Sequence, residues 1–185
     1  MNFSQLRIDP KISKLGSALK KGITFQIKET DVLLYLGASA GTTVSYFSDV
    51  LAKGFIFAVE ISRRMCMHLV FLARQRNNIA PILADAAQPE QYAKNIVPVD
   101  IIYQDVSQRN QVDIFLKNCD MFLKKGGIAI LCLKARSIDL RRKPEDIFAE
   151  AEKEISKQLK LAQKTTLEPW QKEHMFFVFR KEVKF

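Results

Sequence analysis

The sequence predicts a doubly wound α/β fold, in which a mainly parallel sheet carries helices on both of its faces. Short, continuous apolar runs are typical of strands that are buried on both faces. Amphipathic stretches of helical length separate these runs, and glycines stand at several of the junctions. Because parallel strands need long crossover connections, this alternation indicates repeated strand–helix–strand units.

The first half of the chain begins the alternation. Val32–Leu36 is a continuous apolar run that Gly37 ends, and the amphipathic stretch after it is expected to be capped by Thr42 and Thr43. The next predicted elements are a strand at Phe55–Val59, a helix from about Arg63 to Arg76 and a strand at Ile79–Leu83.

The second half continues the alternation and then changes character. The predicted elements are a strand at Val99–Tyr103, a helix from about Gln111 to Leu123, a strand at Ile128–Leu133 after two glycines, and a helix from Pro144 to about Lys160. Two β-like segments, Leu161–Leu167 and Met175–Arg180, end the chain. We expect them to form an antiparallel hairpin at the edge of the sheet.

The chain has the length of one domain. Its 185 residues are enough for one sizeable core, and no internal repeat or composition break marks a second domain. Residues 1–30 are basic and are predicted to be a short N-terminal appendage, too small for a core of its own. Residues 31–185 are predicted to form the main domain.

Composition and charge exclude several classes of protein. The hydrophobic share of 48% and the charged share of 26% are typical of soluble globular proteins. The apolar runs are too short to span a bilayer, and the N-terminus lacks the features of a secretion signal. The formal charge of +9 favours a polyanionic partner such as nucleic acid, with a basic surface that has no partner as the alternative.

The cysteines favour neither a metal site nor a disulfide framework. Their number is odd, and no Cys–x–x–Cys or Cys/His ligand spacing is present. Buried, reduced thiols are therefore expected at Cys66, Cys119 and Cys132.

Polar residues follow the predicted strands at one edge of the sheet, where ligands bind in open doubly wound folds. The first strand ends in a turn of small residues, Gly37–Gly41, which lets the backbone approach a ligand closely. Glu60 follows the second strand, where an acid accepts hydrogen bonds from ribose hydroxyls. Asp85, Asp105 and Lys134 follow the third, fourth and fifth strands. Together these residues predict a cofactor site.

The Gly37–Gly41 turn is also compatible with two other classes of enzyme. It matches the G-x-S-x-G elbow of α/β hydrolases, with Ser39 as nucleophile and with Asp105 and His174 in the required chain order. The position of the turn on the first strand and the acid at Glu60 argue against a hydrolase. A nicotinamide-dependent oxidoreductase needs G-x-G-x-x-G, whereas this turn has Ser39 at the third position and no third glycine. S-adenosylmethionine has no phosphate to cradle, so a looser turn suffices for it.

Several blocks of the sequence resemble the fibrillarin family. They are Leu34–Thr43, Ala58–Glu60, Pro81–Ala86, Gln104–Gln108, Leu133–Asp139 and Leu167–His174. The similarity extends from about Ser13 to Lys181. Fibrillarin is the methyltransferase of box C/D ribonucleoproteins and methylates ribose 2′-hydroxyls of RNA at sites that a guide RNA selects. The resemblance implies a Rossmann-like class I methyltransferase whose cofactor is S-adenosylmethionine.

The resemblance also implies partners. They are a box C/D guide RNA, a target ribosomal or transfer RNA, a Nop-domain scaffold protein and a kink-turn-binding ribosomal-type protein, and no membrane is among them. The isolated chain is expected to be nearly inactive, and to be cytoplasmic in an archaeon or nucleolar in a eukaryote. Two alternatives stay open: a non-catalytic RNA-binding scaffold subunit that keeps the fold, and a protein glutamine as methyl acceptor.

Carried over position by position, the resemblance implies two sets of site residues. Glu60 would hold the ribose of the cofactor, Asp85 and Ala86 the adenine, and Asp105–Gln108 the methionine end. The implied cofactor set is Gly37, Ser39, Gly41, Thr42, Thr43, Glu60, Ile61, Asp85, Ala86, Asp105, Val106, Ser107 and Gln108. The implied catalytic set is Lys14, Asp105, Lys134 and His174.

The chain also departs from the usual pattern of the family. Ser39 and Ala40 stand in exchanged order in the cofactor turn, and Ala135 replaces a usual serine. The small β-rich module that precedes the catalytic domain in the family is expected to be almost absent here. Contacts that this module normally makes are therefore not expected of this chain.

A methyl transfer to a ribose hydroxyl requires the attacking oxygen to lose a proton. We expect Lys134, held by Asp105, either to accept that proton or to stabilise the developing alkoxide as a cation. Lys14 and His174 would orient the ribose and the neighbouring phosphate. A basic cluster beyond Lys134 is predicted to contact the RNA backbone and comprises Arg136, Arg141, Arg142 and Lys143.

Overall fold

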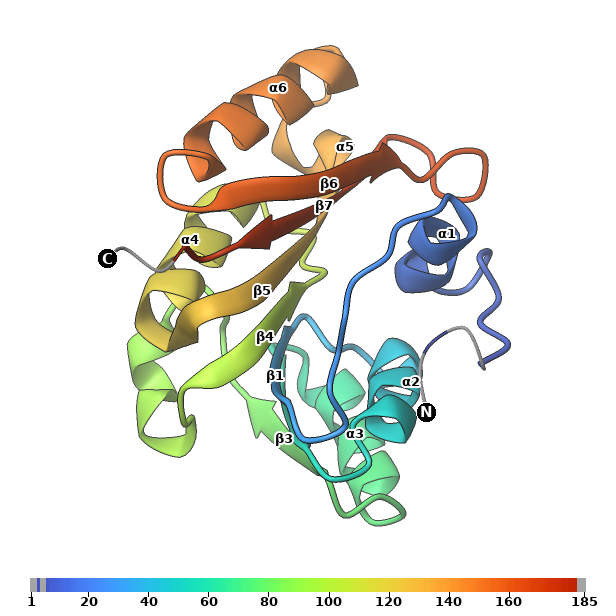
Figure 1. The fold of residues 1–185 in the computed structure, drawn as a ribbon, viewed down its shortest axis with the longest axis vertical. Coiled ribbons are helices and arrows are strands. Elements are labelled where there is room, and N and C mark those ends of the chain that lie inside the picture. The colour runs from blue at the N-terminus through green and yellow to red at the C-terminus, as the bar shows by residue number, and fades with distance from the viewer. Residues whose placement is uncertain (1–2, 4–5, 183–185) are drawn as a thin grey trace.

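The computed structural model of the chain describes residues 3 and 6–182. Seven strands form one sheet in the order β3-β2-β1-β4-β5-β7-β6 (Figure 1). The strands are β1 (Val32–Leu36), β2 (Phe55–Glu60), β3 (Ile79–Leu83), β4 (Val99–Gln104), β5 (Leu123–Lys134), β6 (Lys160–Thr166) and β7 (His174–Arg180). Strands β1 to β5 pair in parallel, while β7 is antiparallel to both β5 and β6. The predicted doubly wound sheet with an antiparallel C-terminal hairpin is confirmed.

Helices cover both faces of this sheet (Figure 1). They are α1 (Lys14–Lys20), α2 (Thr42–Val50), α3 (Arg63–Ala73), α4 (Gln111–Phe122), α5 (Ala135–Ile138) and α6 (Pro144–Ile155), with short 3₁₀ turns at Pro89–Gln91 and Ala93–Asn95. Alternate residues of β1 enter two separate cores. Leu33 and Tyr35 pack with α1, α2 and α3, and Leu34 and Leu36 pack with α4 and α6. This two-sided burial explains why the first strands are continuous apolar runs.

The start of α2 differs from the prediction. The residue before the helix is Gly41, in a left-handed conformation with φ of +92°, and no side chain caps the helix. The expected capping by Thr42 and Thr43 is therefore wrong. The Thr43 hydroxyl instead lies 3.1 Å from the Ser13 hydroxyl, which links the turn to the beginning of α1.

Three element boundaries differ by more than one residue from those predicted. Strand β5 begins at Leu123 instead of Ile128, because a register shift between Val99 and Ile101 absorbs the extra residues while the strand continues past the two glycines. Helix α3 ends at Ala73 and helix α6 ends at Ile155, each followed by a turn.

The segment before β1 contributes to the common core. Leu15 and Ala18 of α1 and Ile23 beyond it are buried together with residues of β1 and α2. In Figure 1, α1 lies beside the loop that joins β6 to β7. Two hydrogen bonds connect them, from Lys21 Nζ to the Glu168 carbonyl (3.2 Å) and from Gln171 Nε2 to the Lys11 carbonyl (3.1 Å).

The cysteines are as predicted, since Cys66, Cys119 and Cys132 are buried and form no disulfide. Within residues 3 and 6–182, no helix combines the length and the apolar character that crossing a membrane requires.

Candidate active site

The turn after β1 is held against the ends of two neighbouring strands. The amides of Gly37 and Ala38 both donate to the Val59 carbonyl at 3.0 Å, and the Asp105 amide donates to the Leu36 carbonyl at 2.9 Å. Gly37 has a φ of +77°, and a Cβ there would lie only 2.5 Å from the Asp105 carbonyl oxygen. Only glycine therefore lets the end of β4 approach the turn this closely.

Glu60 connects this turn to the end of β2. Its Oε2 accepts a hydrogen bond from the Ser39 amide at 2.7 Å, and its Oε1 accepts one from the Ser62 amide at 2.8 Å. Ser39 itself has a φ of +50°, which is uncommon for a residue with a side chain. The buried Glu60 carboxylate thus holds the turn by binding the backbone amide of Ser39 and not its side chain.

A cavity of about 210 Å³ opens beside the Glu60 carboxylate. It is lined by Gly37, Ser39, Val59, Glu60, Ile61, Ala84, Ala86, Asp105, Val106, Ser107 and Gln108. Most of the expected cofactor residues are thereby brought together, along with Val59 and Ala84, which the sequence reasoning missed. Both missed residues are small or apolar neighbours of predicted strand-end acids, and position next to those acids is the signal that could have identified them.

The other four expected cofactor residues lie outside the lining. Gly41, Thr42 and Thr43 are beyond it in the turn and in the first residues of α2. Asp85 is also outside the lining, and its Oδ1 accepts hydrogen bonds from the Ala87 amide (2.9 Å) and from Gln108 Nε2 (3.2 Å). Asp85 therefore holds Gln108, a residue that lines the cavity.

Lys14 and Asp105 form an ion pair at the mouth of the site. Lys14 Nζ lies 2.9 Å from Asp105 Oδ2, and both side chains are mostly buried, at 23% and 19% exposure. Burial lowers the pKa of Lys14, but the Asp105 carboxylate outweighs this effect, so that the net pKa is raised above its ordinary value. Lys14 is thus a fixed cation.

Lys134 and His174 face each other across two strands. They end β5 and begin β7, and they are direct partners in the antiparallel register, so their side chains lie on the same face of the sheet. His174 Nδ1 is 2.7 Å from the Lys172 carbonyl oxygen. Because a carbonyl can only accept, Nδ1 carries the proton, and Nε2 of the neutral ring is left as an acceptor.

The charges around His174 place all four expected catalytic residues in one group. Burial is the main cause that lowers the pKa of His174 below its ordinary value, and the Lys14 and Lys134 ammonium groups lower it further. The Lys172 carbonyl and the Asp105 carboxylate act in the opposite direction. His174 is therefore neutral at physiological pH.

One expected contact within this group is not formed. The ion pair of Asp105 is with Lys14, and not with Lys134 as the sequence reasoning assumed. The reason is tertiary, because α1 brings Lys14 to the carboxylate from the start of the chain.

A match to a protein-family model covers nearly the whole chain. The model is described as Fibrillarin, and it matches residues 5–183. The chain belongs to the fibrillarin family.

Fibrillarin relatives match over most of their length. The fibrillarin-like rRNA/tRNA 2′-O-methyltransferase of Pyrococcus abyssi is 43% identical over 175 residues, which is 94% of this chain and 77% of the relative. A crystal structure of a fibrillarin/Nop5p complex contains a chain with a TM-score of 0.91 and 39% identity, covering 93% of this chain and 82% of that one. Fibrillarin of Aeropyrum pernix, crystallised with natively bound S-adenosyl-L-methionine, has a TM-score of 0.84 and 36% identity, covering 92% and 75%.

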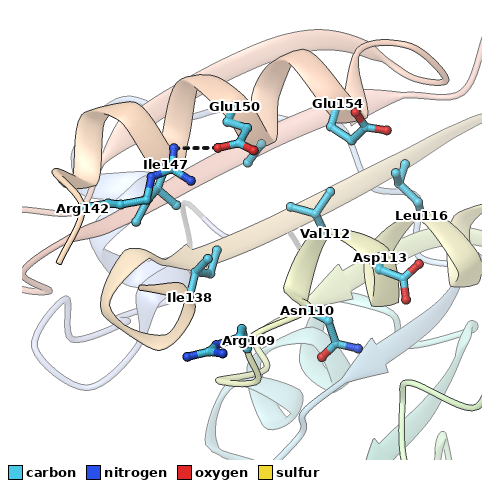
Figure 2. A pocket seen from close by; sticks show the side chains of 11 residues that line it. Arg109, Asn110, Val112, Asp113, Leu116, Ile138, Arg142, Ile147, Glu150 and Glu154 are labelled. Carbon is cyan, nitrogen blue, oxygen red and sulfur yellow. Dashed lines mark ion pairs between the residues drawn. The ribbon is translucent and has the colours of Figure 1, made fainter. Parts of the chain in front are cut away.

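The four basic residues expected to contact RNA differ in whether they form ion pairs. Arg136 forms an ion pair with Glu173 at 2.6 Å, and Arg142 forms one with Glu150 at 2.6 Å. Figure 2 shows the second pair at the rim of a hollow of about 450 Å³ that lies between α4, α5 and α6. Arg141 and Lys143 are exposed, and neither forms an ion pair in the part of the chain that the structure describes.

Proposed function

We propose that this chain transfers a methyl group from S-adenosylmethionine to the 2′-hydroxyl of a ribose in ribosomal or transfer RNA. The observation that carries the proposal is the position of Asp105, which lines the cavity and also holds Lys14 in the group with Lys134 and His174. The Asp105 carboxylate therefore belongs both to the lining of the cofactor cavity and to the group of residues that would handle the proton. The name of the Pyrococcus abyssi relative supports the same activity.

The residues of the cavity fit this cofactor. Glu60 presents a buried carboxylate as acceptor for ribose hydroxyls, Asp105 presents a second one for the amino group of the methionine end, and Ile61 and Ala86 supply apolar walls for the adenine. The bound cofactor would supply an electrophilic methyl group on a positively charged sulfur. The natively bound S-adenosyl-L-methionine of the Aeropyrum pernix relative supports this assignment.

His174 is placed to take the proton of the attacking hydroxyl. Its Nδ1 proton is engaged with the Lys172 carbonyl, so the lone pair of Nε2 is available, and its lowered pKa keeps the ring neutral. As the ribose oxygen forms its bond to the methyl carbon, the carbon–sulfur bond breaks with its electron pair left on sulfur. The hydroxyl proton passes to Nε2.

The two lysines act as cations with different tasks. Lys14 is fixed by Asp105 and orients the ribose and its neighbouring phosphate. Lys134 forms no ion pair within the described chain, which leaves its ammonium free to stabilise negative charge on the attacking oxygen. Between the two roles expected for Lys134, the geometry favours charge stabilisation, because His174 supplies the proton acceptor.

The RNA and its protein partners complete the proposal. Target selection by a box C/D guide RNA requires that this chain contribute phosphate contacts more than base contacts, and the exposed Arg141 and Lys143 suit that task. The complex of a relative with Nop5p supports a Nop-domain scaffold as partner. A kink-turn-binding protein would bind the same guide.

The test is methyl transfer in a reconstituted particle. The chain is combined with a guide RNA, a matched target RNA, a Nop-domain scaffold and a kink-turn-binding protein, and label is followed from the cofactor into RNA. We expect guide-dependent transfer that falls by about 100-fold in Lys134→Ala, the loss typical of removing one charge-stabilising group. Transfer to a protein glutamine alone, or cofactor binding without any transfer, would contradict the proposal.

A further inference from the structure

Gln111 holds the backbone of Lys134 with both ends of its side-chain amide. It is the first residue of α4 and is completely buried. Its Oε1 accepts a hydrogen bond from the Lys134 amide at 3.0 Å, and its Nε2 donates to the Lys134 carbonyl at 3.1 Å. A side chain thus forms the pair of hydrogen bonds that a neighbouring strand would otherwise form.

The topology explains why Lys134 needs this partner. Strand β4 ends at Gln104, which is paired with Leu131, so the last residues of β5 extend beyond β4. The peptide groups of Lys134 that point to this side have no strand residue opposite them. Buried backbone groups are almost always paired, and Gln111 supplies the pairing.

The hydrogen bonds to Gln111 also fix how Lys134 meets His174. Because the N–H and C=O of Lys134 point toward α4, they do not point toward β7. Lys134 and His174 are therefore a non-hydrogen-bonded antiparallel pair, in which the Cα atoms approach to about 4.5 Å and the side chains are closest. By binding the backbone of Lys134, the Gln111 amide helps to keep the side chains of Lys134 and His174 next to each other.

A second glutamine supports the first. Gln104 Nε2 donates to the Gln111 carbonyl at 2.7 Å, and Gln104 directly precedes Asp105. Gln104 is fully buried, and its Oε1 has no hydrogen-bond partner in the described residues. An apolar residue would avoid this unpaired oxygen, so packing alone does not explain a glutamine at the end of β4.

We propose that Gln111 is a positioning residue for methyl transfer, acting through the backbone of Lys134 and supported by Gln104. The role in transfer rests on the proposed function, because it requires Lys134 to act on the attacking oxygen. A displacement of about 1 Å at a reacting group can lower a rate by about 100-fold. Loss of the amide should therefore slow transfer without weakening cofactor binding, since Gln111 does not line the cofactor cavity.

The test compares Gln111→Met with a matched control at the other end of the sheet. Asn78 precedes β3, and its Nδ2 donates to the carbonyls of Ser48 (3.0 Å) and Leu51 (2.9 Å). Asn78→Leu likewise removes a side-chain amide that binds two backbone groups, but far from the strand ends that carry the site. Gln111→Asn is a milder variant, which keeps an amide but shortens its reach by one methylene group.

Two measurements are made on each variant. The first is hydrogen exchange of the Lys134 amide in the folded chain, which we expect to accelerate at least about tenfold in Gln111→Met and not in Asn78→Leu. The second is the single-turnover rate in the reconstituted particle at saturating cofactor and RNA. We expect a fall of about 10- to 100-fold in Gln111→Met, an intermediate fall in Gln111→Asn, and a rate within about twofold of the unchanged chain in Asn78→Leu.

The outcomes separate this inference from the proposed function. Unchanged Lys134 exchange in Gln111→Met would overturn the inference, whatever the rates. Faster exchange with an unchanged rate, or a fall in rate equal to that of Asn78→Leu, would overturn the positioning role. If the unchanged chain fails to methylate RNA at all, the proposed function fails and the positioning role fails with it, whereas the exchange experiment still reports the Gln111–Lys134 contact.

Discussion

Gly37→Ala adds one methyl group where the cofactor turn meets the end of β4. The new Cβ would lie 2.5 Å from the Asp105 carbonyl oxygen and 2.9 Å from its carbonyl carbon. Both atoms belong to the backbone, so no rotamer change relieves the overlap. Alanine at the observed φ of +77° costs about 1–2 kcal/mol, and a forced overlap of this kind adds about 1–3 kcal/mol. We therefore expect the free energy of unfolding to fall by about 2–5 kcal/mol.

Gly22→Ala is the matched control. Gly22 also has a positive φ, of +90°, but an added Cβ would meet no atom within 4 Å. This variant suffers only the conformational part of the loss, about 1–2 kcal/mol. The difference between the two variants isolates the contact with Asp105.

The assay is urea unfolding at fixed pH, followed by the fluorescence of Trp170, the single tryptophan of the chain. Cofactor affinity is measured by calorimetry on the same samples. Because Asp105 lines the cavity, Gly37→Ala should also weaken cofactor binding, whereas Gly22→Ala should not. Equal losses of stability in the two variants, with equal cofactor affinity, would refute the reasoning.

Four further predictions concern the charged groups. Lys14→Met removes the ammonium that lies 2.9 Å from the Asp105 carboxylate, so the single-turnover rate of methyl transfer should fall by about 100-fold. Lys14→Arg should recover part of this rate. An unchanged rate in Lys14→Met would show that Lys14 takes no part in the mechanism. Burial lowers the pKa of His174 below its ordinary value, so the rate should stay constant around neutral pH and fall only in more acidic solution, as Nε2 gains a proton. A rate that rises toward acid would exclude His174 as the proton acceptor. The folded chain disfavours the protonated His174 ring, so the pKa of His174 is lower in the folded than in the unfolded state. The free energy of unfolding that His174 contributes is therefore fully present above its unfolded pKa and is lost as pH falls through its folded pKa. Urea titrations at several pH values measure this loss. Arg141→Ala and Lys143→Ala should each reduce the slope of log affinity for RNA against log salt concentration by about one. Arg142→Ala should change this slope less, because the Arg142 guanidinium is already paired with Glu150. Equal slopes in all three variants would contradict this difference.

The parallel half of the sheet could be predicted closely because its physics is local. Strand β1 is buried on both faces and must be apolar along nearly its whole length, so it has the predicted boundaries. Strand β3 also has the predicted boundaries, although it is an edge strand whose residues are mostly half-buried. The start of β5 could not be predicted, because Gly126 and Gly127 are typical of a turn and only pairing with β4 keeps the chain extended there. Likewise, α1 is short and basic, and its helical structure depends on burying Leu15 against the sheet.

The site could be predicted as a set of strand ends but not as a set of contacts. The position of Glu60 follows from strand order alone, whereas the pairing of Asp105 with Lys14 depends on where α1 packs. Gln111 gave no signal, since a glutamine in the first turn of a helix is ordinary. Its role becomes visible only when β5 is seen to extend beyond β4.

The most direct test of the account is the position of the transferred methyl group. Two target RNAs are offered to the reconstituted particle, identical except that one has a 2′-deoxyribose at the guide-selected nucleotide, and the nucleosides are analysed by mass spectrometry. The account predicts a 2′-O-methyl nucleoside at that position in the first RNA and no transfer to the second. Equal methylation of both RNAs, or a methyl group on a base, would contradict it.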